Sequence, residues 1–307
     1  MTNFSHQSVL LCPTLDWLQP KEGHLTIDGT VGGGGHSEAI LKATTSGRLL
    51  GFDRDGDAIN AAAERLRPFS GRYQLIRADF AEMEHHVPSG SVTGVLLDLG
   101  ISSHQLDTPT RGFGFESEVL DMRLDTRETV TAAHLVNELS LEELIDIMRR
   151  HGDEPEARRI ARAVVRRRQS IPFQSARDLA SFVESVCPRR GRKSHPATRL
   201  FQSLRYEVNR EPESLQRGLK AAMNVLQPGG RLCVITFESS TDRLTRDFMR
   251  AEARDYDVPG EVDDPMVRIP RAPRGRIMTR KPVLPDETEI KANPRSRSAH
   301  LRVLEKL

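Results

Sequence analysis

Residues 25–37 constrain the possible fold of this chain more than any other segment. A short apolar run, Leu25–Asp28, ends in an acid, four consecutive glycines follow at positions 32–35, and a helical pattern starts near Ser37. Glycine allows the backbone to turn sharply and to approach a ligand closely, and the free N–H groups of a helix start favour polar or anionic groups. The segment therefore predicts a strand, a ligand-binding turn and a helix, which together form the first unit of a parallel α/β fold.

The alternation of apolar runs and helical patterns continues through the first hundred residues. The expected strands are Leu25–Asp28, Leu49–Asp53, Gln74–Asp79 and Val92–Leu99, with helices starting near Ser37, Asp57 and Ala81. After Gly100 the β pattern stops for more than a hundred residues. It returns after an expected turn in the runs Arg231–Phe237, Arg276–Lys281 and Ala299–Glu305; the turn is Gln227–Gly230. This rhythm predicts a doubly wound, Rossmann-like α/β sheet.

A helical insertion accounts for the interruption of the β pattern. Its expected helices are Val130–Leu139, Leu141–His151, Pro155–Gln169, Ala176–Val186 and Thr198–Val208, and a further helix, Ser214–Leu226, leads back to the sheet. We expect one α/β domain formed by residues 1–106 and 206–307 and a helical domain formed by residues 107–205, inserted after the fourth strand. The Pro- and Arg-rich segment Pro265–Pro285 is expected to be an exposed loop.

Charge is distributed unevenly along the chain, although the formal net charge is only +2. The segment Arg149–Arg210 contains 15 Arg and one Lys against six acids, so it carries +10 and leaves −8 to the remainder. Segregated positive charge indicates a nucleic-acid partner for the insertion. Solvated, arginine-rich helix faces would give the same count, so the charge alone does not decide between the two.

Composition disfavours several classes of protein. No run of residues approaches the ~18 apolar positions of a membrane span, and the N-terminus lacks the features of a signal peptide. We therefore expect a cytoplasmic protein without membrane contact. The cysteines Cys12, Cys187 and Cys233 are too scattered for a disulfide framework or a metal site, and the histidines are dispersed, so we expect reduced thiols and no metal. The oligomeric state does not follow from the sequence.

Acids stand where the first four expected strands end, at Asp28, Asp53, Asp79 and Asp98. Open α/β sheets bind their ligands at this edge. Asp53 is placed to accept both ribose hydroxyls of a nucleoside, and Asp79 with the following Phe80 is placed to meet its adenine. Four carboxylates suit a cationic sulfonium ligand such as S-adenosylmethionine and would repel a pyrophosphate, although each of them alone is also a common helix N-cap.

A nicotinamide-dependent oxidoreductase on the same fold is the first alternative. Its cofactor is usually bound by a GxGxxG turn, and here Ser37 or Glu38 occupies the place of the last small residue. The acids at the later strand ends have no role with that cofactor. Both features favour the sulfonium ligand.

Eight longer motifs run along the chain: His6–Leu10, Asp28–Ser37, Asp98–Asp107, Arg111–Phe115, Leu120–Asp125, His195–Arg205, Pro228–Leu232 and Asn293–Ala299. In these motifs, and over nearly its whole length, the chain resembles the bacterial 16S rRNA cytosine-N4 methyltransferase family (RsmH or MraW). The resemblance implies a class I methyltransferase sheet and S-adenosylmethionine as methyl donor. It also implies transfer to the exocyclic N4 of a cytidine in the decoding region of 16S rRNA, within the small ribosomal subunit.

The resemblance carries the family's cofactor contacts over to Gly34, Gly35, His36, Asp53, Phe80, Asp98 and Gln105. The chain departs from the family pattern at two places. Ser117–Val119 stands where the family usually has Asp-Gly-Pro, and Glu238 stands where it usually has His. These departures keep a second alternative open, a non-catalytic RNA-binding or ribosome-assembly factor on a methyltransferase fold.

Asp98 and Arg123 are the candidate catalytic residues. Asp98 is placed to accept a hydrogen bond from N4 and to offset the positive charge that develops there, or else to orient the amino group of the cofactor. Arg123 is a candidate because a charged residue at its place in the motif has no evident packing role. The Asp-Pro-Pro-Tyr motif of many amino-methyltransferases is absent, so N4 as the target atom depends on the resemblance. Methylation at cytosine C5 needs a cysteine nucleophile, and the three cysteines lie outside the strand-end motifs.

Basic residues of the insertion are the candidate contacts with RNA phosphates. They are Arg166, Arg167, Arg168, Arg189, Arg190, Arg192, Lys193 and Arg199, and a second basic run spans Arg268–Lys281. Such contacts position RNA without reading its sequence. Phe113 and Phe115 are candidates for stacking on an unpaired base, and packing within a loop is an equally good account of them.

Overall fold

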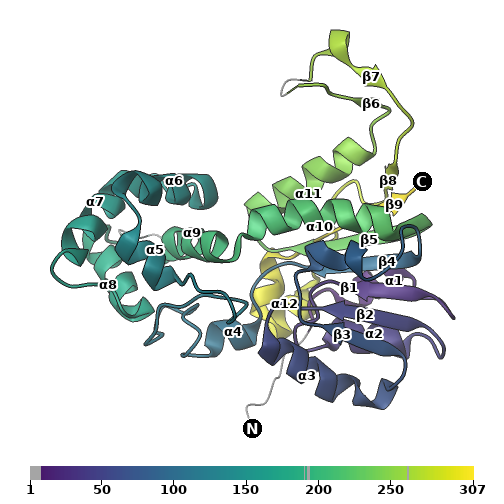
Figure 1. The fold of residues 1–307 in the computed structure, drawn as a ribbon, viewed down its shortest axis with the longest axis horizontal. Helices are drawn as coiled ribbons and strands as arrows, with labels where there is room; N and C mark the ends of the chain where they lie inside the picture. Colours follow the sequence, from purple (N-terminus) through teal and green to yellow (C-terminus); the bar gives the residue numbers. More distant parts are fainter. Residues whose placement is uncertain (1–7, 190, 192–193, 261–262) are drawn as a thin grey trace. The chain divides into compact units, whose positions relative to one another are not determined.

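The computed structural model describes residues 8–189, 191, 194–260 and 263–307. Contacts divide the chain into two compact units: unit 1 comprises Met1–Gly100 and Ser214–Leu307, and unit 2 comprises Ile101–Glu213. Unit 1 contains the sheet, and unit 2 is helical (Figure 1). The contact boundaries lie a few residues from positions 106 and 206, where the sequence pattern places them.

Within the described residues, unit 1 has a seven-stranded sheet in the order β3-β2-β1-β4-β5-β9-β8. The strands are β1 (Leu25–Asp28), β2 (Arg48–Phe52), β3 (Tyr73–Ile76), β4 (Val92–Asp98), β5 (Leu226–Thr236), β8 (Gly275–Ile277) and β9 (His300–Lys306). Strands β1 to β5 run parallel to their neighbours in that set, and β9 is antiparallel to both β5 and β8. The predicted doubly wound sheet is confirmed.

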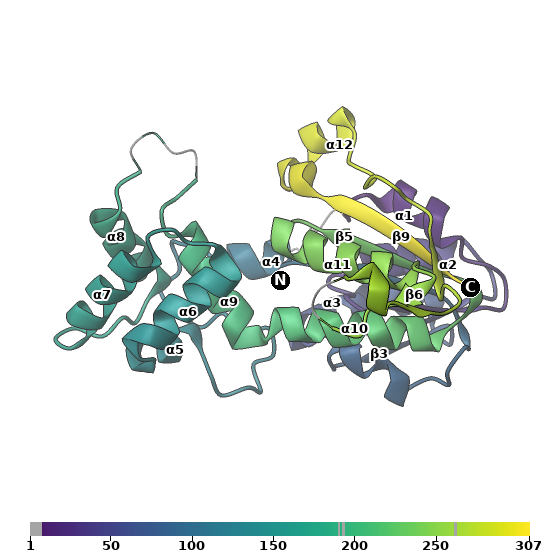
Figure 2. The same cartoon turned by 90° about the horizontal axis from the view of Figure 1, so that it is seen from above.

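Helices cover both faces of this sheet (Figure 2). They are α1 (Leu11–Leu18), α2 (Gly35–Lys42), α3 (Gly56–Leu66), α10 (Glu211–Val225), α11 (Ser239–Glu252) and α12 (Glu287–Ala292), with the 3-10 turns η1 (Arg67–Phe69), η2 (Phe80–His85) and η4 (Pro294–Ser298). Successive strand residues point to opposite faces: Val95 and Leu97 belong to the core beneath α10 and α11, and Leu96 to the core beneath α1 and α2. Each fully buried Leu or Val contributes about 1.5–3 kcal/mol to stability.

Strand β3 ends at Ile76, earlier than the sequence pattern suggests. The Ala78 N–H donates to the Ile76 carbonyl at 3.0 Å, which turns the chain away from the sheet. Asp79 is therefore not a strand end. It begins η2 instead, because its side chain accepts a hydrogen bond from the Ala81 N–H at 2.9 Å.

The expected turn at Gln227–Gly230 is a bulge within β5. Helix α10 ends at Val225, and the strand begins at once at Leu226. Residues 227–230 stand opposite the single residue Thr93 of β4, and Gly229 has a φ of +78° there. The extra residues bend the strand without ending it.

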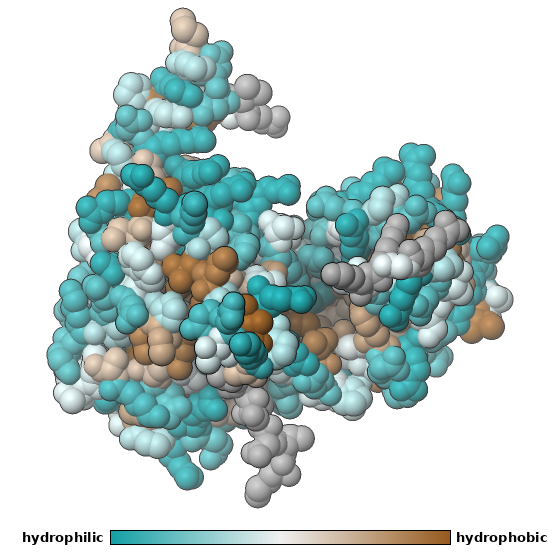
Figure 3. Space-filling model, turned by 180° about the vertical axis from the view of Figure 1, so that it is seen from behind, coloured by the Kyte–Doolittle hydropathy of each residue, from teal (hydrophilic) through white to brown (hydrophobic). Residues whose placement is uncertain are grey.

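A two-stranded arm extends from unit 1 between α11 and β8 (Figure 1). Strand β6 (Tyr256–Asp257) pairs antiparallel with β7 (Ile269–Pro270), and the 3-10 turn η3 (Pro265–Val267) lies between them. The arm is mostly hydrophilic in Figure 3, although Met266 is 89% exposed. The segment that the sequence predicts to be a loop thus contains β7, and β8 overlaps the expected β run Arg276–Lys281.

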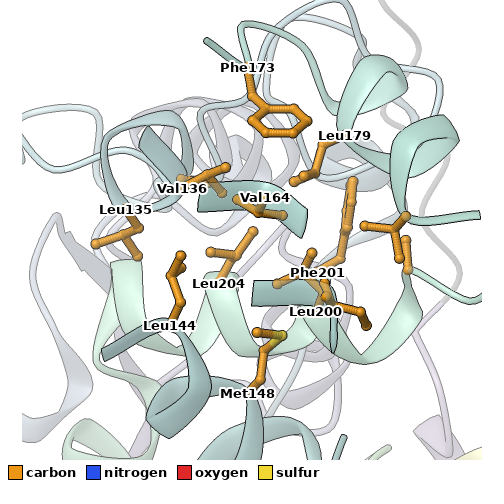
Figure 4. Packing of buried hydrophobic residues seen from close by; sticks show 14 of the residues in the cluster. Leu135, Val136, Leu144, Met148, Val164, Phe173, Leu179, Leu200, Phe201 and Leu204 are labelled. Carbon is orange, nitrogen blue, oxygen red and sulfur yellow. The ribbon is translucent and has the colours of Figure 1, made fainter. Parts of the chain in front are cut away.

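Unit 2 is a set of helices around its own apolar core. They are α4 (Ser103–Asp107), α5 (Ala132–Glu138), α6 (Leu141–Gly152), α7 (Ala157–Arg168), α8 (Ala176–Val186) and α9 (Thr198–Asn209). Figure 4 shows side chains from several of them meeting, among them Leu144, Val164 and Leu204. Local sequence sets where the helices start: Ser140 caps α6 in a reciprocal capping box with Glu143.

Candidate active site

Three acids lie along the carboxyl edge of neighbouring strands. Strands β2, β1 and β4 are adjacent and parallel, so their ends bring Asp53, Asp28 and Asp98 to the same edge. Burial raises the pKa of Asp53 and of Asp98, and repulsion from Asp28 adds to both shifts. The ionised carboxylates at this edge are unfavourable in the free protein, so a positively charged ligand is favoured there.

Asp28 holds the glycine-rich turn in place. Its Oδ2 accepts a hydrogen bond from Ser37 Oγ at 2.6 Å, and its Oδ1 accepts one from the Thr30 N–H at 3.2 Å. Burial raises its pKa to about 6 in spite of these hydrogen bonds. Because Asp28 is only 1% exposed, whereas Asp53 is partly exposed, Asp28 serves chiefly to fix the start of α2.

Asp53 joins the glycine-rich turn to the start of α3. Its Oδ2 accepts from the Gly32 N–H and its Oδ1 from the Asp55 N–H, both at 2.9 Å. Burial is the main cause that raises its pKa to about 6. A carboxylate has about four acceptor positions, so Asp53 retains capacity to accept from ribose hydroxyls.

Asp98 differs from the other two acids because its Oδ1 is buried and has no hydrogen-bond partner among the described residues. Its Oδ2 lies 3.7 Å from Nδ1 of His36, whose Nε2 donates to the Val9 carbonyl at 3.0 Å. Burial, followed by repulsion from Asp28, raises the pKa of Asp98 to about 7. A buried acceptor left open is costly to a protein, so the site favours a ligand that donates a hydrogen bond or carries positive charge.

Gly34 and Gly35 start α2 where other segments come close. Gly34 has a φ of +78°, and a Cβ on it would lie 3.2 Å from Cα of Ala62. A Cβ on Gly35 would lie 2.1 Å from Oγ of Ser8. No side chain of the described residues caps this helix start, and the first N–H groups of a helix have no partner within the helix itself. Sequence reasoning did not identify Ser8 as a neighbour of this turn, since only the folded chain brings it there.

Phe80 packs closely against α10. A Cβ on Gly218 would lie 2.1 Å from Cε2 of the Phe80 ring, so only glycine leaves room for the ring. The neighbouring Asp79 is buried, and its carboxylate accepts from Ser214 Oγ at 2.6 and 2.7 Å and from the guanidinium group of Arg54. The expected role of Asp79 as an acceptor for adenine is thus corrected, because the protein already engages its oxygens. Gly218 and Ser214 are too distant in sequence for a local pattern to reveal them.

Gln105 belongs to α4 of unit 2 and is 5% exposed. It forms a capping box with Ser102: the Ser102 N–H donates to its side-chain oxygen at 2.9 Å, and its own N–H donates to Ser102 Oγ at 3.2 Å. Its contact with the cofactor stays a prediction.

Arg123 has a structural role that the sequence did not indicate. Its guanidinium group donates to both oxygens of Asp121, at 2.8 and 2.6 Å, and to the Glu128 carbonyl at 2.5 Å. The hydrogen bond to Asp121 raises the pKa of Arg123 further. We proposed Arg123 as catalytic because a charged residue at this position had no evident packing role. That reason is wrong, because Arg123 closes the loop in which it stands.

The two phenylalanines of the same loop also serve packing. Phe113 is 6% exposed in the core of unit 2. The Phe115 ring stacks on His195 with 4.6 Å between ring centres and lies edge-on to Phe201 at 4.8 Å. Of the two accounts left open for these residues, the structure favours loop packing.

The segment Ser117–Val119, where the chain departs from the family pattern, supports the start of α8. The carbonyls of Ser117 and Val119 accept from the Arg177 and Ala176 N–H groups, at 3.2 and 3.1 Å. Glu118 adds an ion pair with Arg177 at 2.5 Å. These contacts satisfy two N–H groups of the first helical turn, so this departure has a structural explanation.

Glu238, the second departure, stands at the N-cap position of α11 directly after β5. Its carbonyl accepts from the Asp242 N–H at 3.0 Å. Behind it, Asp242 accepts two hydrogen bonds from Arg302, at 2.7 and 2.9 Å. Strand β5 adjoins β4, so Glu238 follows the strand next to the one that ends in Asp98.

The structure separates the predicted phosphate contacts into groups, and Arg167 and Arg168 turn inward. The Arg167 guanidinium pairs with Asp178 at 2.8 Å and lies 4.0 Å from the ring centre of Phe173. Arg168 donates to two carbonyls at the end of α5, at 2.7 and 2.5 Å. Both guanidinium groups stabilise unit 2, so we remove them from the predicted contacts with RNA.

The other predicted contacts are on the surface or undescribed. Arg189 pairs with Glu184 at 2.6 Å, and Arg199 donates to the Asp153 carbonyl at 2.6 Å. Arg166 is exposed and has no partner among the described residues. Arg190, Arg192 and Lys193 lie outside the described residues. For this group the contact with phosphate stays a prediction.

The second basic run, Arg268–Lys281, is largely neutralised by acids from elsewhere in unit 1. The ion pairs are Arg268 with Asp263, Arg271 with Asp257, Arg274 with Glu252 and Arg276 with Glu305. The absence of acids within the run therefore overstates the positive charge that it offers to RNA.

The cysteines are unsuited to nucleophilic catalysis. Burial raises the pKa of the Cys233 thiol to about 12, Cys187 is buried, and Cys12 lies exposed on α1. Across residues 8–189, 191, 194–260 and 263–307, no group of three or more His, Cys, Asp or Glu side chains is arranged to hold a metal ion. Over the same part of the chain, no helix combines the length and the apolar character that crossing a bilayer requires.

A parallel sheet with an antiparallel β9 between β5 and β8, a glycine-rich turn after β1 and acids at the strand ends define the fold of the class I methyltransferases. The chain belongs to the MraW methylase family, whose model matches residues 3–307.

Relatives of this family are similar to the chain over their whole length. The ribosomal RNA small subunit methyltransferase H of Carboxydothermus hydrogenoformans is 45% identical, over 99% of this chain and 98% of its own. The protein of the same name from Syntrophobacter fumaroxidans is 46% identical, over 98% and 96%. The solved structure of an rRNA methylase from Streptococcus thermophilus gives a TM-score of 0.44 at 11% identity, covering 96% of this chain and 95% of the other.

Proposed function

We propose that this protein transfers the methyl group of S-adenosylmethionine to the exocyclic N4 of a cytidine in the decoding region of 16S rRNA, within the small ribosomal subunit. The relatives named above are ribosomal RNA small subunit methyltransferases at more than 40% identity. The observation that carries the proposal is the buried oxygen of Asp98, which has no partner among the described residues at the ligand-binding edge of a methyltransferase fold.

The residues at this edge fit the cofactor. The proposed contacts are Gly34, Gly35, His36, Asp53, Phe80, Asp98 and Gln105. Asp53 has acceptor capacity for the ribose hydroxyls, and the buried negative charge around Asp98 suits a positively charged sulfur. The first N–H groups of α2 suit a carboxylate group.

When bound, S-adenosylmethionine would supply an electrophilic methyl group: N4 would form a bond to this carbon as the carbon–sulfur bond breaks, leaving S-adenosylhomocysteine, and one N4 proton would pass to solvent. Asp98 accepts a hydrogen bond from the N4 amino group, which holds the nitrogen in position and offsets the positive charge that develops on it. Its alternative role is to orient the amino group of the cofactor. Nδ1 of His36 lies 3.7 Å from Oδ2 of Asp98 and limits the positions that the carboxylate can take.

Methylation at cytosine C5 is the alternative reaction on the same base, and the thiols of the chain argue against it. Methylation at C5 begins with attack by a cysteine thiolate on the ring. Cys233 is held protonated by burial, with a pKa of about 12, and Cys187 is buried in unit 2. The family resemblance supports N4.

Transfer of labelled methyl groups tests the proposal. The protein is incubated with labelled S-adenosylmethionine and either small ribosomal subunits or naked 16S rRNA, and the RNA is digested to nucleosides. The expected product is N4-methylcytidine from the small subunits, with less from naked rRNA. A protein that binds the subunits but transfers no label would instead be the non-catalytic assembly factor, and the proposal would be wrong.

Asp98→Asn separates the two roles of Asp98. If the carboxylate accepts from N4, kcat measured at saturating S-adenosylmethionine is expected to fall by about 10²–10³, whatever loss of cofactor affinity accompanies it. Weaker cofactor binding with an unchanged kcat would assign Asp98 to the cofactor. The melting temperature in the presence of S-adenosylmethionine or NAD is a simple control, and a rise with NAD alone would favour the oxidoreductase.

A further inference from the structure

Helix α7 has one buried face and one face of arginines. Ala157, Ile160, Ala161 and Val164 point into the core of unit 2. On the opposite face Arg158, Arg162 and Arg166 are exposed, at a spacing of four residues. One helical turn is 3.6 residues and the rise is 1.5 Å per residue, so these three form a row with about 6 Å between successive positions.

We call these three arginines the α7 ridge. None of Arg158, Arg162 and Arg166 has a hydrogen-bond or ion-pair partner among the described residues. Three other exposed arginines of unit 2 do have partners: Arg127 pairs with Asp125 at 2.6 Å, Arg150 with Glu207 at 3.0 Å and Arg177 with Glu118 at 2.5 Å. The ridge thus differs from these three arginines because it lacks a partner among the described residues, and it aligns three such arginines along one helix face. Residue counts along the sequence cannot show this difference.

An unpaired row of like charges has a cost for the helix. Like charges four residues apart repel one another, and the first turn of α7 contains no acid to interact with the helix dipole. Arg167 and Arg168, the neighbours of Arg166, engage in the contacts that hold unit 2 together. The fold therefore uses the inward arginines for stability and leaves the ridge available to an external anion.

We propose that the α7 ridge binds the sugar–phosphate backbone of the rRNA substrate, with Arg158, Arg162 and Arg166 each contacting a phosphate. This inference rests on the proposed function and specifies which surface holds its substrate. Guanidinium groups match phosphate geometry in bidentate contacts, and a row along one helix face suits the regular charges of a nucleic-acid strand. The ridge contributes affinity and orientation, not choice of nucleotide.

A triple variant, R158Q/R162Q/R166Q, is compared with a control triple variant, R127Q/R150Q/R177Q. Both remove three positive charges from exposed positions of unit 2, and Gln is close to Arg in helix propensity, which preserves α7. The measured quantity is the dependence of affinity for a 16S rRNA fragment on salt concentration. Loss of three phosphate contacts is expected to lower the slope of log K against log salt by about two to three, and the control by less than about one.

Equal slopes for the two variants would overturn the proposal, since net charge alone would then explain binding. A ridge variant that binds naked rRNA normally but binds small subunits weakly would also overturn it, because the partner would then be a ribosomal protein. Methyl transfer distinguishes this failure from failure of the proposed function. The ridge variant is expected to raise KM for the subunits with little change in kcat, whereas a wild-type protein without transfer activity contradicts the proposed function and leaves the salt dependence as measured.

Discussion

The three acids at this edge of the sheet differ in whether the protein donates hydrogen bonds to their carboxylate oxygens. Asp28 and Asp53 accept hydrogen bonds from the glycine-rich turn and from the residues that follow it, whereas Oδ1 of Asp98 accepts none from the described residues. An ionised carboxylate in this state is unfavourable until a donor or a cation meets it. Asp98 is therefore the residue at which ligand charge and protein protonation are coupled.

The affinity for S-adenosylmethionine is expected to rise with pH as Asp98 loses its proton. Burial, with a contribution from Asp28, raises the pKa of Asp98 to about 7. Below that pH the cation has to displace a proton, so its binding constant falls by up to about tenfold for each pH unit. S-adenosylhomocysteine lacks the positive sulfur, so its affinity is expected to change less. Calorimetric titrations of both ligands from about pH 5.5 to 8.5 measure the difference.

Asp98→Asn is the control for this dependence. It is expected to flatten the response around pH 7 and to leave the smaller contribution of Asp28 and Asp53, whose pKa values are each raised to about 6. His36 faces the same carboxylate at 3.7 Å, so His36→Gln is measured beside it. An affinity of the wild-type protein that is constant across the range would show that Asp98 does not face the sulfur.

At the scale of elements, local sequence predicts most helices and strands because their signals are local. Capping residues and apolar spacing place α6 and α8 within a residue of their observed bounds. The sequence was less reliable where tertiary contacts decide: β3 ends before Asp79, and residues 227–230 form a bulge instead of a turn. At the end of β3 the hydrogen bond from the Ala78 N–H to the Ile76 carbonyl turns the chain, and at residues 227–230 the pairing of β5 with β4 continues on both sides of the bulge.

The loop that contains Arg123 is an element that the sequence could not explain, because α9 holds it from a distance. The Asn209 side chain donates to the Met122 carbonyl at 2.8 Å and accepts from the Leu124 N–H at 2.7 Å. Met122 has a φ of +63°, a strained conformation for a non-glycine residue. The motif Leu120–Asp125 therefore specifies the conformation of a loop. Arg123 belongs to the motif because its hydrogen bonds help to close that loop.

Asn209→Ala is expected to open this loop without unfolding unit 2. The change leaves buried backbone groups of residues 122 and 124 without partners, at a cost of about 2–4 kcal/mol. Hydrogen exchange at the Leu124 amide measures the opening. Asn137→Ala is the matched control, since Asn137 binds the backbone of Phe173 in the same way, at 2.8 and 2.9 Å. It should accelerate exchange at Phe173 and leave Leu124 protected, and equal effects of both variants at Leu124 would contradict a local clamp.

At the scale of the whole molecule, charge was the least predictable property. The excess of arginine in Arg149–Arg210 is a correct count, but a count does not say which arginines meet an acid. Arg274 pairs with Glu252 and Arg276 with Glu305, partners that lie 22 and 29 residues away. The charge available to an external partner is what remains after such pairing. This unpaired charge is greater on α7 than on the run Arg268–Lys281, although from the sequence alone both segments are candidate contacts for RNA.

Because each unit has its own core, the two proposed ligands are expected to protect different parts of the chain from hydrogen exchange. S-adenosylmethionine at about one hundred times its Kd stabilises the segments that bind it by about 2.7 kcal/mol, so slower exchange is expected at the ends of β1, β2 and β4 and at the start of α2. An rRNA fragment is expected to slow exchange in and around α7 instead. Mass spectrometry of peptides from the intact protein resolves the two patterns. Protection of α6, α7 and α8 by the cofactor alone would contradict the assignment of separate binding surfaces, because none of these helices contains a proposed cofactor contact.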